Sequence, residues 1–466
     1  IGRATIIQIA REFASTAEAT KGRCMVISGA SSNHYYHSDL IYRSFIGTLM
    51  LTGCVGRNGG GQNHYVGQER LAPFDSWGQI SHALDWARPP RFQNTPSYWY
   101  IHTQMFKYDD KLTEYHVVPD KNAIKYQHCA DWQVQAVRLG GLPWYPQLNK
   151  SPLVVAEDAQ KAGAKTDADI VNYTAKQIKN GGLQFAVEDP DAPDNWPRVW
   201  MIWRGNALGS SARGHEYFMK FLLGTHHNMD CEEIAKPYIN DMKYRESPLG
   251  KLDLIVDLNM RMNTTPIYSD IVLPAAHWYE KEDINTTDLH SYIHPMGAAV
   301  TPNWESKSDW DAFKFIAKKF SELAEKHFPK PVKDVVITPL MHDTPGEITQ
   351  PAIPDVKDWK KGDCDLIPGV TGPNISVATR DYANVYNRYI SLGPLMKGKY
   401  GFHNIMLDGG PFYKEYMNDA HTQTVEWGGE KYISLREAKE ACNAVIFFSS
   451  LTNGEVNYQE WLIEEH

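Results

Sequence analysis

A glycine-rich segment at residues 53–68 is the clearest chemical signal in this 466-residue sequence. Six of its sixteen residues are glycine, and Gly59, Gly60 and Gly61 stand in a row before Gln62 and Asn63. Because glycine has no Cβ, the backbone N–H groups of such a segment approach a ligand closely. The segment is therefore a candidate anion cradle, although a tight turn without a ligand explains the three glycines equally well.

Two further loops carry similar chemistry. One follows the apolar run 199–203, and the other follows the apolar run 252–258. Both combine arginine with amide and hydroxyl side chains: Arg204, Asn206, Ser210 and Ser211 in the first loop, and Arg261, Asn263, Thr264 and Thr265 in the second. Arginine and hydroxyl groups are suited to phosphate oxygens. Together with the three glycines, these loops predict one nucleotide-type ligand that is held at several points.

The remaining candidates are single polar residues. Asp257, near the end of the second apolar run, is suited to accept hydrogen bonds from ribose hydroxyls or a guanine edge, and an exposed Asp that caps a turn is the alternative. His34 with His37, and likewise His290 with His294, have the spacing of zinc ligands. Neither pair has a third ligand nearby, so no metal site is predicted, and His34 is interpreted as a group that faces a substrate.

The composition excludes several classes of function. Charged residues make up 22% of the chain and the formal net charge is −9, which argues against nucleic-acid binding through a basic surface. No apolar run is long enough to span a bilayer. The six cysteines contain no C-x-x-C pair, and no G-x-G-x-x-G or Walker A motif supports an ordinary NAD or nucleotide site. The sequence begins within a helical pattern and without Met, so we expect an interior fragment.

The order of apolar patterns predicts an α/β fold. Residues 1–61 are expected to form a helix, a strand and a second helix, and later strands are expected at 199–203 and 252–258. This order is typical of doubly wound, mostly parallel sheets, in which ligands bind beyond the carboxyl ends of the strands. Ser308 followed by Asp311 resembles a capping box, and a helix is expected from there to about Glu325.

These patterns predict five segments. Residues 1–64 and 198–285 are the two parts of an α/β cofactor-binding domain, and residues 65–197 are a long, irregular, aromatic-rich insertion between them. Residues 286–330 are the helical part of a second α/β domain. Prolines at 331, 339, 345, 351, 354 and 368 predict an extended wrap for residues 331–466.

Several motifs resemble one family closely. Ser28–His34, Leu51–Gly61 and Ser269–Asp283 are similar to motifs of the molybdopterin oxidoreductases of the dimethyl sulfoxide reductase superfamily. Within that superfamily the chain resembles the catalytic alpha subunits of respiratory nitrate reductase and nitrite oxidoreductase. The motifs that carry this closer resemblance are Asn63–Arg70, Ala83–Pro89, Gly250–Asp253 and Asp355–Gly369.

The resemblance implies a bis(molybdopterin guanine dinucleotide) molybdenum cofactor. It implies that Asn33 and His34 lie near the pterin and the molybdenum pocket, and that the segment from Gly59 to Asn63 lines the cofactor. Arg204, Asn206, Ser210 and Ser211 would hold one dinucleotide. Asp257, Arg261, Asn263 and Thr264 would hold its guanine and phosphate end.

The resemblance also implies oxygen-atom transfer between nitrite and nitrate, with electrons passed to an iron–sulfur beta subunit. A haem or membrane-anchor gamma subunit would complete a membrane-associated complex. In the relatives, the Asp ligand of molybdenum and the cysteines of a [4Fe-4S] cluster precede the matched region, so both are expected only in a missing N-terminal part.

The alternatives concern the substrate and the direction of the reaction. Relatives of the bacterial nitrate reductase type have Trp-Ala where this chain has Gln62-Asn63, which favours nitrite oxidoreductase. A related molybdoenzyme acting on perchlorate, selenate or another substrate, and a non-catalytic scaffold homologue, are the other interpretations.

Overall fold

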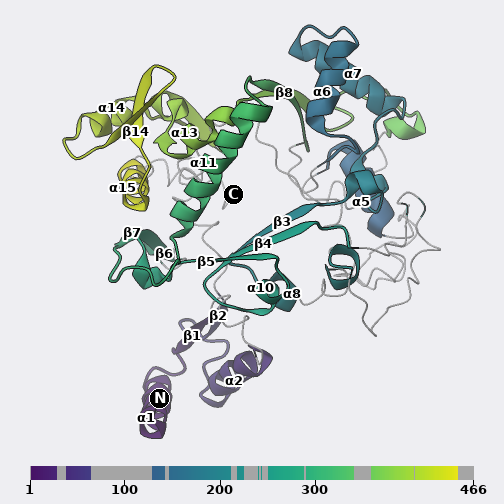
Figure 1. Cartoon of the computed structure of the whole chain (residues 1–466). Helices are drawn as coiled ribbons and strands as arrows, with labels where there is room; N and C mark the ends of the chain where they lie inside the picture. The colour runs from purple at the N-terminus through teal and green to yellow at the C-terminus, as the bar shows by residue number, and fades with distance from the viewer. Residues whose placement is uncertain are drawn as a thin grey trace.

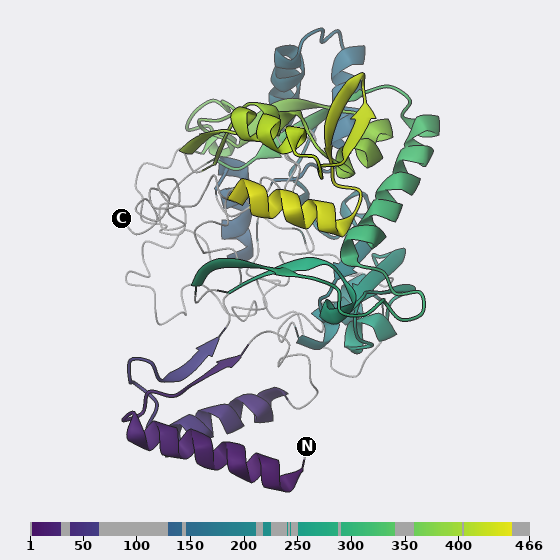
Figure 2. The same ribbon diagram turned by 90° about the vertical axis from the view of Figure 1, so that its left-hand side faces the viewer.

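The chain is an α/β protein in its computed structural model, which describes residues 2–28, 38–64, 129–141, 146–210, 218–224, 240, 243, 250–287, 290–340, 358–402 and 405–449. Figure 1 shows an N-terminal unit, a central parallel sheet, a helical unit and a C-terminal unit, and Figure 2 shows them from the side. Parallel strands occur in the first two units, as the predicted α/β class requires.

The N-terminal unit is a parallel β-α-β arrangement preceded by one long helix. Its elements are α1 (Arg3–Ala19), β1 (Met25–Ser28), α2 (Ser38–Leu51) and β2 (Gly61–His64). β1 and β2 pair in parallel, with Met25 opposite Gly61. Ala17, Leu49 and Cys54 form its small buried core. The predicted helix, strand and helix are confirmed, and β2 is an additional strand.

Gly60 lies where backbone segments of this unit come closest together. A Cβ at this position would lie 2.3 Å from the carbonyl oxygen of Gly22 and 2.5 Å from that of Cys54. The N–H of Gly60 donates to the carbonyl of Arg57 at 2.8 Å. The middle glycine is therefore required by the packing of the chain against itself.

The central sheet has three parallel strands in the order β3-β4-β5. They are β3 (Val199–Trp203), β4 (Leu254–Asn259) and β5 (Ile271–Pro274). The short helices α8 (Ala207–Ser210) and α10 (Thr264–Ile267) follow β3 and β4 and contact each other (Figure 1). Because β3 and β4 are parallel and adjacent, the loops at their carboxyl ends meet at one edge of the sheet.

Both faces of this sheet carry apolar contacts. Leu208 packs with Phe218 and Leu222 of η7 (Phe218–Leu222), in a cluster that includes Trp200 of β3. On the other face, Leu258 packs with Ala312 of α11 (Asp309–His327). Coverage of both faces is usual for a parallel sheet.

The helical unit lies between the N-terminal unit and the central sheet in the sequence. It contains α5 (Cys129–Leu139), α6 (Pro152–Lys161), α7 (Asp167–Lys179), η5 (Ala186–Glu188) and η6 (Pro193–Asn195). These elements share a core with the antiparallel strands β8 (Val332–Thr338) and β9 (Asn374–Arg380). The prediction of an irregular insertion is wrong for the described part of 65–197, because Pro152 and the Thr166 capping box begin regular helices.

The C-terminal unit is also regular. Its elements are η11 (Tyr382–Asn384), α13 (Val385–Tyr389), β10 (Ser391–Leu392), η12 (Pro394–Lys397), β11 (Lys399–Phe402), β12 (Ile405–Asp408), α14 (Gly410–Asn418), β13 (Thr424–Trp427), β14 (Glu430–Ser434) and α15 (Ala438–Ser449). Leu392, Tyr413, Ile433 and Phe448 belong to its core. The predicted extended wrap is wrong for the described part of 331–466, because Pro331 and Pro339 flank β8 instead of interrupting it. The domain boundaries themselves stay predictions.

Helix α11 runs from the central sheet to the C-terminal unit (Figures 1 and 2). Its N-cap is Ser308, whose Oγ accepts a hydrogen bond from the N–H of Asp311 at 3.1 Å, so the predicted helix start is confirmed. The large apolar residues of this helix are only partly buried, since Phe320 remains 45% exposed and Leu323 47% exposed. Small residues such as Ala317 and Ala324 form the buried face instead.

The remaining elements are short. η9 (Trp278–Glu280) precedes the antiparallel pair β6 (Asp283–Thr287) and β7 (His290–Met296), and η10 (Trp359–Lys361) packs in the helical unit. Across the described ranges, none of the helices has the length and apolar character needed to cross a bilayer.

Replacing Gly60 by Ala tests the close approach at the start of β2. The added Cβ would collide with two backbone carbonyl oxygens, so we expect Gly60→Ala to lower the free energy of unfolding by roughly 1–3 kcal/mol. Denaturant unfolding of the chain measures this change.

Gly47→Ala is the matched control, because Gly47 lies within α2 with no neighbouring atom within 4 Å of an added Cβ. Alanine should stabilise that helix by about 0.5–1 kcal/mol. Equal effects of the two substitutions would show that the backbone contact at Gly60 is not tight.

Candidate functional site

Hydrogen bonds join the loops that follow β3 and β4. The Oδ1 of Asn206 accepts from the backbone N–H of Thr265 at 3.2 Å and from its hydroxyl at 3.1 Å. The backbone N–H of Leu208 donates to the Thr265 hydroxyl oxygen at 3.0 Å, and the amide of Asn259 donates to the carbonyl of Gly205 at 3.0 Å. The structure therefore brings together two of the three loops predicted from the sequence.

Gly209 makes room for the Asn206 side chain. A Cβ at residue 209 would lie 2.4 Å from Nδ2 and 2.7 Å from Oδ1 of Asn206. Any larger residue would displace the amide that accepts both hydrogen bonds from Thr265. Gly209 thus shapes the connection between the two loops from within α8.

Asp257 is completely buried in β4, between Ile202 and Val272 of the neighbouring strands. Its Oδ1 accepts from the amide of Asn259 at 3.2 Å, and its Oδ2 has no hydrogen-bond donor among the described residues. Burial raises the pKa of this carboxyl above its ordinary value of 3.8, and the hydrogen bond from Asn259 opposes that shift. The alternative of an exposed Asp that caps a turn is wrong, because Asp257 lies inside the strand.

The loop after β4 contains three other predicted residues. Asn263 is the N-cap of α10, and its Oδ1 accepts from the N–H of Thr265 at 3.1 Å. Its Nδ2 is buried and has no acceptor in the described ranges. Arg261 and Thr264 are exposed on the same loop. Asp257 and Asn263 thus hold a buried acceptor and a buried donor whose partners would have to come from a ligand or from residues outside the described ranges.

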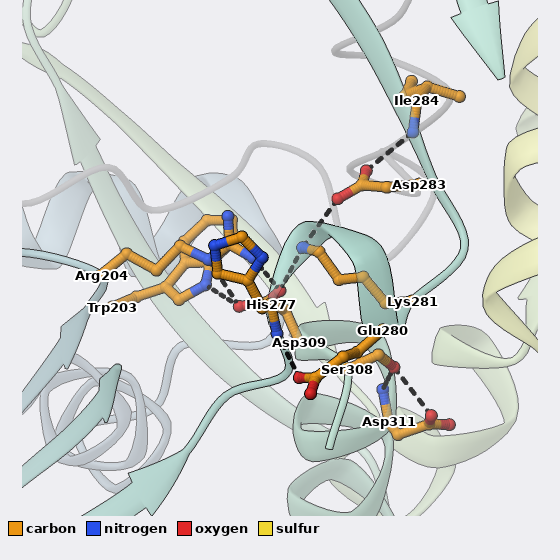
Figure 3. Close-up of polar contacts among 10 residues, drawn as sticks. All are labelled: Trp203, Arg204, His277, Glu280, Lys281, Asp283, Ile284, Ser308, Asp309 and Asp311. Atoms are coloured by element: carbon orange, nitrogen blue, oxygen red, sulfur yellow. Dashed lines mark hydrogen bonds and ion pairs between the residues drawn. The ribbon is translucent and has the colours of Figure 1, made fainter. Parts of the chain in front are cut away.

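Arg204, also predicted from the sequence, pairs with the first residue of α11. Its Nε donates to Oδ1 of Asp309 at 2.9 Å, and its Nη2 donates to Oδ2 of the same carboxylate (Figure 3). The indole N–H of Trp203 and the ammonium of Lys281 also donate to Asp309, at 2.8 and 2.7 Å. The guanidinium is therefore held by a carboxylate at the end of β3.

The Asp309 carboxylate is ionised in these surroundings. Burial alone would raise its pKa, but the hydrogen bonds from Arg204, Lys281 and Trp203 outweigh burial and hold the pKa below 3.8. Lys281 also pairs with Asp283 at 2.7 Å, so two cationic and two anionic side chains meet at this place (Figure 3).

The three glycines lie at the start of β2, on the separate β1–β2 sheet. The N–H of Gly60 is used in its own turn, and the N–H of Gly61 donates to the carbonyl of Cys24 at 3.2 Å. These two N–H groups therefore do not form the expected anion cradle in this structure, because pairing with β1 and with the turn uses them. Asn63 lies opposite Ile27 in the sheet.

Gln62 contacts the end of β1. Its side-chain amide donates to the hydroxyl of Ser28 at 3.4 Å, where β1 ends. Asn33, His34 and Ser211 lie outside the described residues, and Ser210 is described only as the last residue of α8. Within the described ranges, no three His, Cys, Asp or Glu side chains gather as a bound metal ion would require.

Four residues of this region were not predicted as site residues: Asn259, Gly209, Lys281 and Asp309. Asn259 and Gly209 stand within or beside the predicted loops, so their polarity or small size was a usable signal. Lys281 and Asp309 lie far along the sequence from Arg204, and no local pattern connects them with it.

Comparison with known proteins identifies relatives along almost the whole chain. A family model described as molybdopterin oxidoreductase matches residues 4–319. The chain is similar to the respiratory nitrate reductase 1 alpha chain of Escherichia coli (strain K12), with 43% identity over 473 residues that cover 99% of this chain and 37% of that relative. It is also 43% identical over 466 residues to the nitrate reductase alpha chain of Bacillus subtilis (strain 168), covering 99% of this chain and 38% of that one.

The respiratory nitrate reductase 2 alpha chain of Escherichia coli (strain K12) is 48% identical over 403 residues, which cover 85% of this chain and 32% of that relative. The chain thus spans less than two fifths of the length of the curated relatives it matches.

Replacing Asp257 by Asn tests whether its carboxylate lowers the free energy of unfolding of the chain. An ionised acceptor that is buried without its full set of donors costs roughly 1–3 kcal/mol, so Asp257→Asn should raise the free energy of unfolding of the isolated chain at neutral pH. The pKa of Asp257 is raised in the folded state, so ionisation of this carboxyl lowers the stability of the fold. Below pH 3.8 the carboxyl is protonated in both the folded and the unfolded chain, and this loss of stability is absent. The advantage of the variant should therefore grow as pH rises from 3.8 and level off above the raised pKa.

Denaturant unfolding at a series of pH values measures this difference. Asp253→Asn is the control, because it removes an exposed carboxylate next to the start of β4 that pairs with Arg198. That variant should not stabilise the chain. A loss of stability in Asp257→Asn at neutral pH would show that donors outside the described residues already satisfy the carboxylate.

Proposed function

Because the chain belongs to the molybdopterin oxidoreductase family, we propose that it forms part of the molybdenum-containing catalytic alpha subunit of an enzyme that interconverts nitrite and nitrate. The observation that carries this proposal is identity of 43% to two nitrate reductase alpha chains over 99% of the sequence. When bound, the cofactor supplies a molybdenum centre that exchanges one oxygen atom and two electrons with the substrate, and the protein binds and orients both.

We propose the bis(molybdopterin guanine dinucleotide) form of the cofactor, and the described residues fit a guanine. Guanine presents N–H donors at N1 and N2 and an acceptor at O6. Asp257 holds a buried acceptor without a donor, and Asn263 holds a buried donor without an acceptor. A guanine edge would satisfy both atoms, with the carboxylate on the N–H groups and the amide on O6.

The other predicted residues would hold the rest of the cofactor. We assign Asn206, Ser210, Ser211 and the Arg204 loop to one dinucleotide, and Arg261 and Thr264 to its phosphate end. The segment from Gly59 to Asn63 would line the cofactor. The N–H groups of Gly60 and Gly61 would not take part, because they already donate to backbone carbonyls of the chain.

We also propose that β1–β2 and β3–β4–β5 are parts of one doubly wound sheet. Each has parallel strands and exposed apolar residues, with Ile27 at 54%, Val199 at 60% and Trp203 at 58% exposure. Parallel sheets are normally covered on both faces, so these exposed residues favour further covering elements in the whole protein, as a doubly wound sheet has.

The partners belong to the proposed complex. An iron–sulfur beta subunit would exchange electrons with the catalytic subunit, and a haem or membrane-anchor gamma subunit would attach the complex to a membrane. A [4Fe-4S] cluster would be held by residues of the full-length protein beyond this sequence. The relatives are named alpha chains, and a subunit of that kind is consistent with such an assembly.

Asn33 and His34 are the proposed substrate-facing residues. An amide and an imidazole are suited to orient a small anion such as nitrite. The proposed preference for nitrite oxidation rests on the polar pair Gln62-Asn63. The hydrogen bond from Gln62 to Ser28 places Gln62 next to the end of β1.

The cofactor proposal is tested by Asp257→Asn in the full-length enzyme. If the carboxylate binds guanine, the variant should retain much less guanine nucleotide per enzyme than wild type, although we expect the substitution to stabilise the isolated chain. Nucleotide released on denaturation, measured by chromatography against molybdenum content, gives the ratio. Asp253→Asn should retain the wild-type amount. Unchanged guanine nucleotide in Asp257→Asn would overturn the assignment, and cytosine nucleotide in wild type would overturn the guanine form.

The catalytic proposal is tested by His34→Ala in the full-length enzyme. Loss of an orienting donor should reduce nitrite or nitrate turnover by about 100-fold while molybdenum content stays near that of wild type. His37→Ala, three residues along the same segment, is the control and should change neither quantity strongly. Equal losses of turnover and molybdenum would make His34 a residue that retains the cofactor. Turnover of perchlorate or selenate in place of nitrite and nitrate would overturn the proposed substrate.

A further inference from the structure

Asp309 joins three different parts of the chain through hydrogen bonds. Trp203 and Arg204 come from the end of β3, Lys281 lies between η9 and β6, and Asp309 itself is the first residue of α11 (Figure 3). Asp309 is 8% exposed, and its pair with Arg204 is bidentate. Bidentate pairing fixes the orientation of a guanidinium as well as its position.

The charges around Asp309 are already balanced. Arg204 and Lys281 carry two positive charges, and Asp283 and Asp309 carry two negative charges, so the group is neutral as a whole. Arg204 therefore contributes little net charge to a phosphate. A role for Arg204 must lie in the geometry that its ion pair imposes.

That geometry concerns the turn from β3 into the loop. Arg204 has a φ of +56°, in the left-handed region that residues other than glycine rarely adopt. Its N–H donates to the carbonyl of Leu258 at 2.9 Å, which continues the pairing with β4. Arg204 is thus fixed both by the ion pair of its side chain and by the hydrogen bond of its N–H. A residue other than glycine keeps a positive φ only when surrounding contacts of this kind hold it there.

The loop leaves this turn directly toward the proposed dinucleotide site. Gly205 accepts a hydrogen bond from Asn259, and Asn206 accepts two from Thr265. Rotation at Arg204 would move both residues, because they follow it immediately in the chain. Helix α11 therefore determines, through one carboxylate, where residues 205–210 lie.

We infer that Asp309 is a positioning residue for the dinucleotide site, and that Arg204 acts through Asp309 instead of neutralising a cofactor phosphate. This inference rests on the proposed function. It reassigns Arg204 from a direct ligand to part of the support of the loop, and it adds a residue that no sequence motif indicated.

The test is a double-mutant cycle in the full-length enzyme, with Asp309→Asn, Arg204→Gln and both substitutions together. The readouts are the rate of guanine nucleotide release and the hydrogen exchange of residues 205–210. Each single variant should release nucleotide about tenfold faster, as is typical when an outer partner of a ligand site is removed. The double variant should be no worse than either single variant, because both remove the same contact. Exchange in 205–210 should accelerate in all three.

Arg204→Lys separates the two roles of Arg204 with a milder change. Lysine keeps the positive charge but not the bidentate fork, so it should behave like Arg204→Gln if the ion pair positions the loop. It should behave like wild type if charge on a phosphate matters. Asp283→Asn is the matched control, because it removes a carboxylate from the same group and leaves the pair of Arg204 with Asp309 intact. It should change neither readout.

Additive losses in the cycle, or a wild-type release rate in Arg204→Lys, would overturn the inference and leave the proposed function standing. Failure of Asp309→Asn to fold would leave Arg204→Lys to decide. A wild-type enzyme without pterin nucleotide would overturn the proposed function itself, and this inference with it.

Discussion

One buried carboxylate connects the parts of the molecule that form the candidate site. Asp309 begins a long helix and accepts hydrogen bonds from two consecutive residues at the end of β3 and from Lys281. An ionised carboxylate in such a place is stable only with donors of this number and charge, and its lowered pKa reflects them. The sheet, its loop and α11 are thereby held in one arrangement, on which the loops at the sheet edge depend.

The site itself combines satisfied and unsatisfied polar groups. Asn206 accepts two hydrogen bonds from Thr265, so the two strand-end loops support one another without a ligand. Asp257 and Asn263 each bury an atom without a partner in the described ranges. Unsatisfied buried groups reduce stability in the absence of a ligand, and proteins retain them where a ligand completes the network. This division separates polar groups that hold the two loops together from polar groups that are left for a ligand.

Sequence reasoning succeeded where chemistry and strand order are local. The parallel strands, the loops after them and the Ser308 cap follow from patterns within a few residues, and all are present. It failed for the described residues between 129 and 197 and between 331 and 449, where tryptophan, tyrosine and proline content suggested irregular chain. There Pro331 and Pro339 flank a strand, and helices far apart in sequence supply the apolar partners that make each element stable.

The sequence by itself determined the family, the α/β class and the loops that carry polar groups, because these depend on residue types and short spacings. Only the tertiary structure decided what each group contacts. The N–H of Gly60 serves a turn, and Arg204 pairs with a carboxylate 105 residues away. Asp257 lies fully buried where an exposed position was the alternative. Hydrogen bonds and burial depend on which distant segments fold together, so no local pattern contains them.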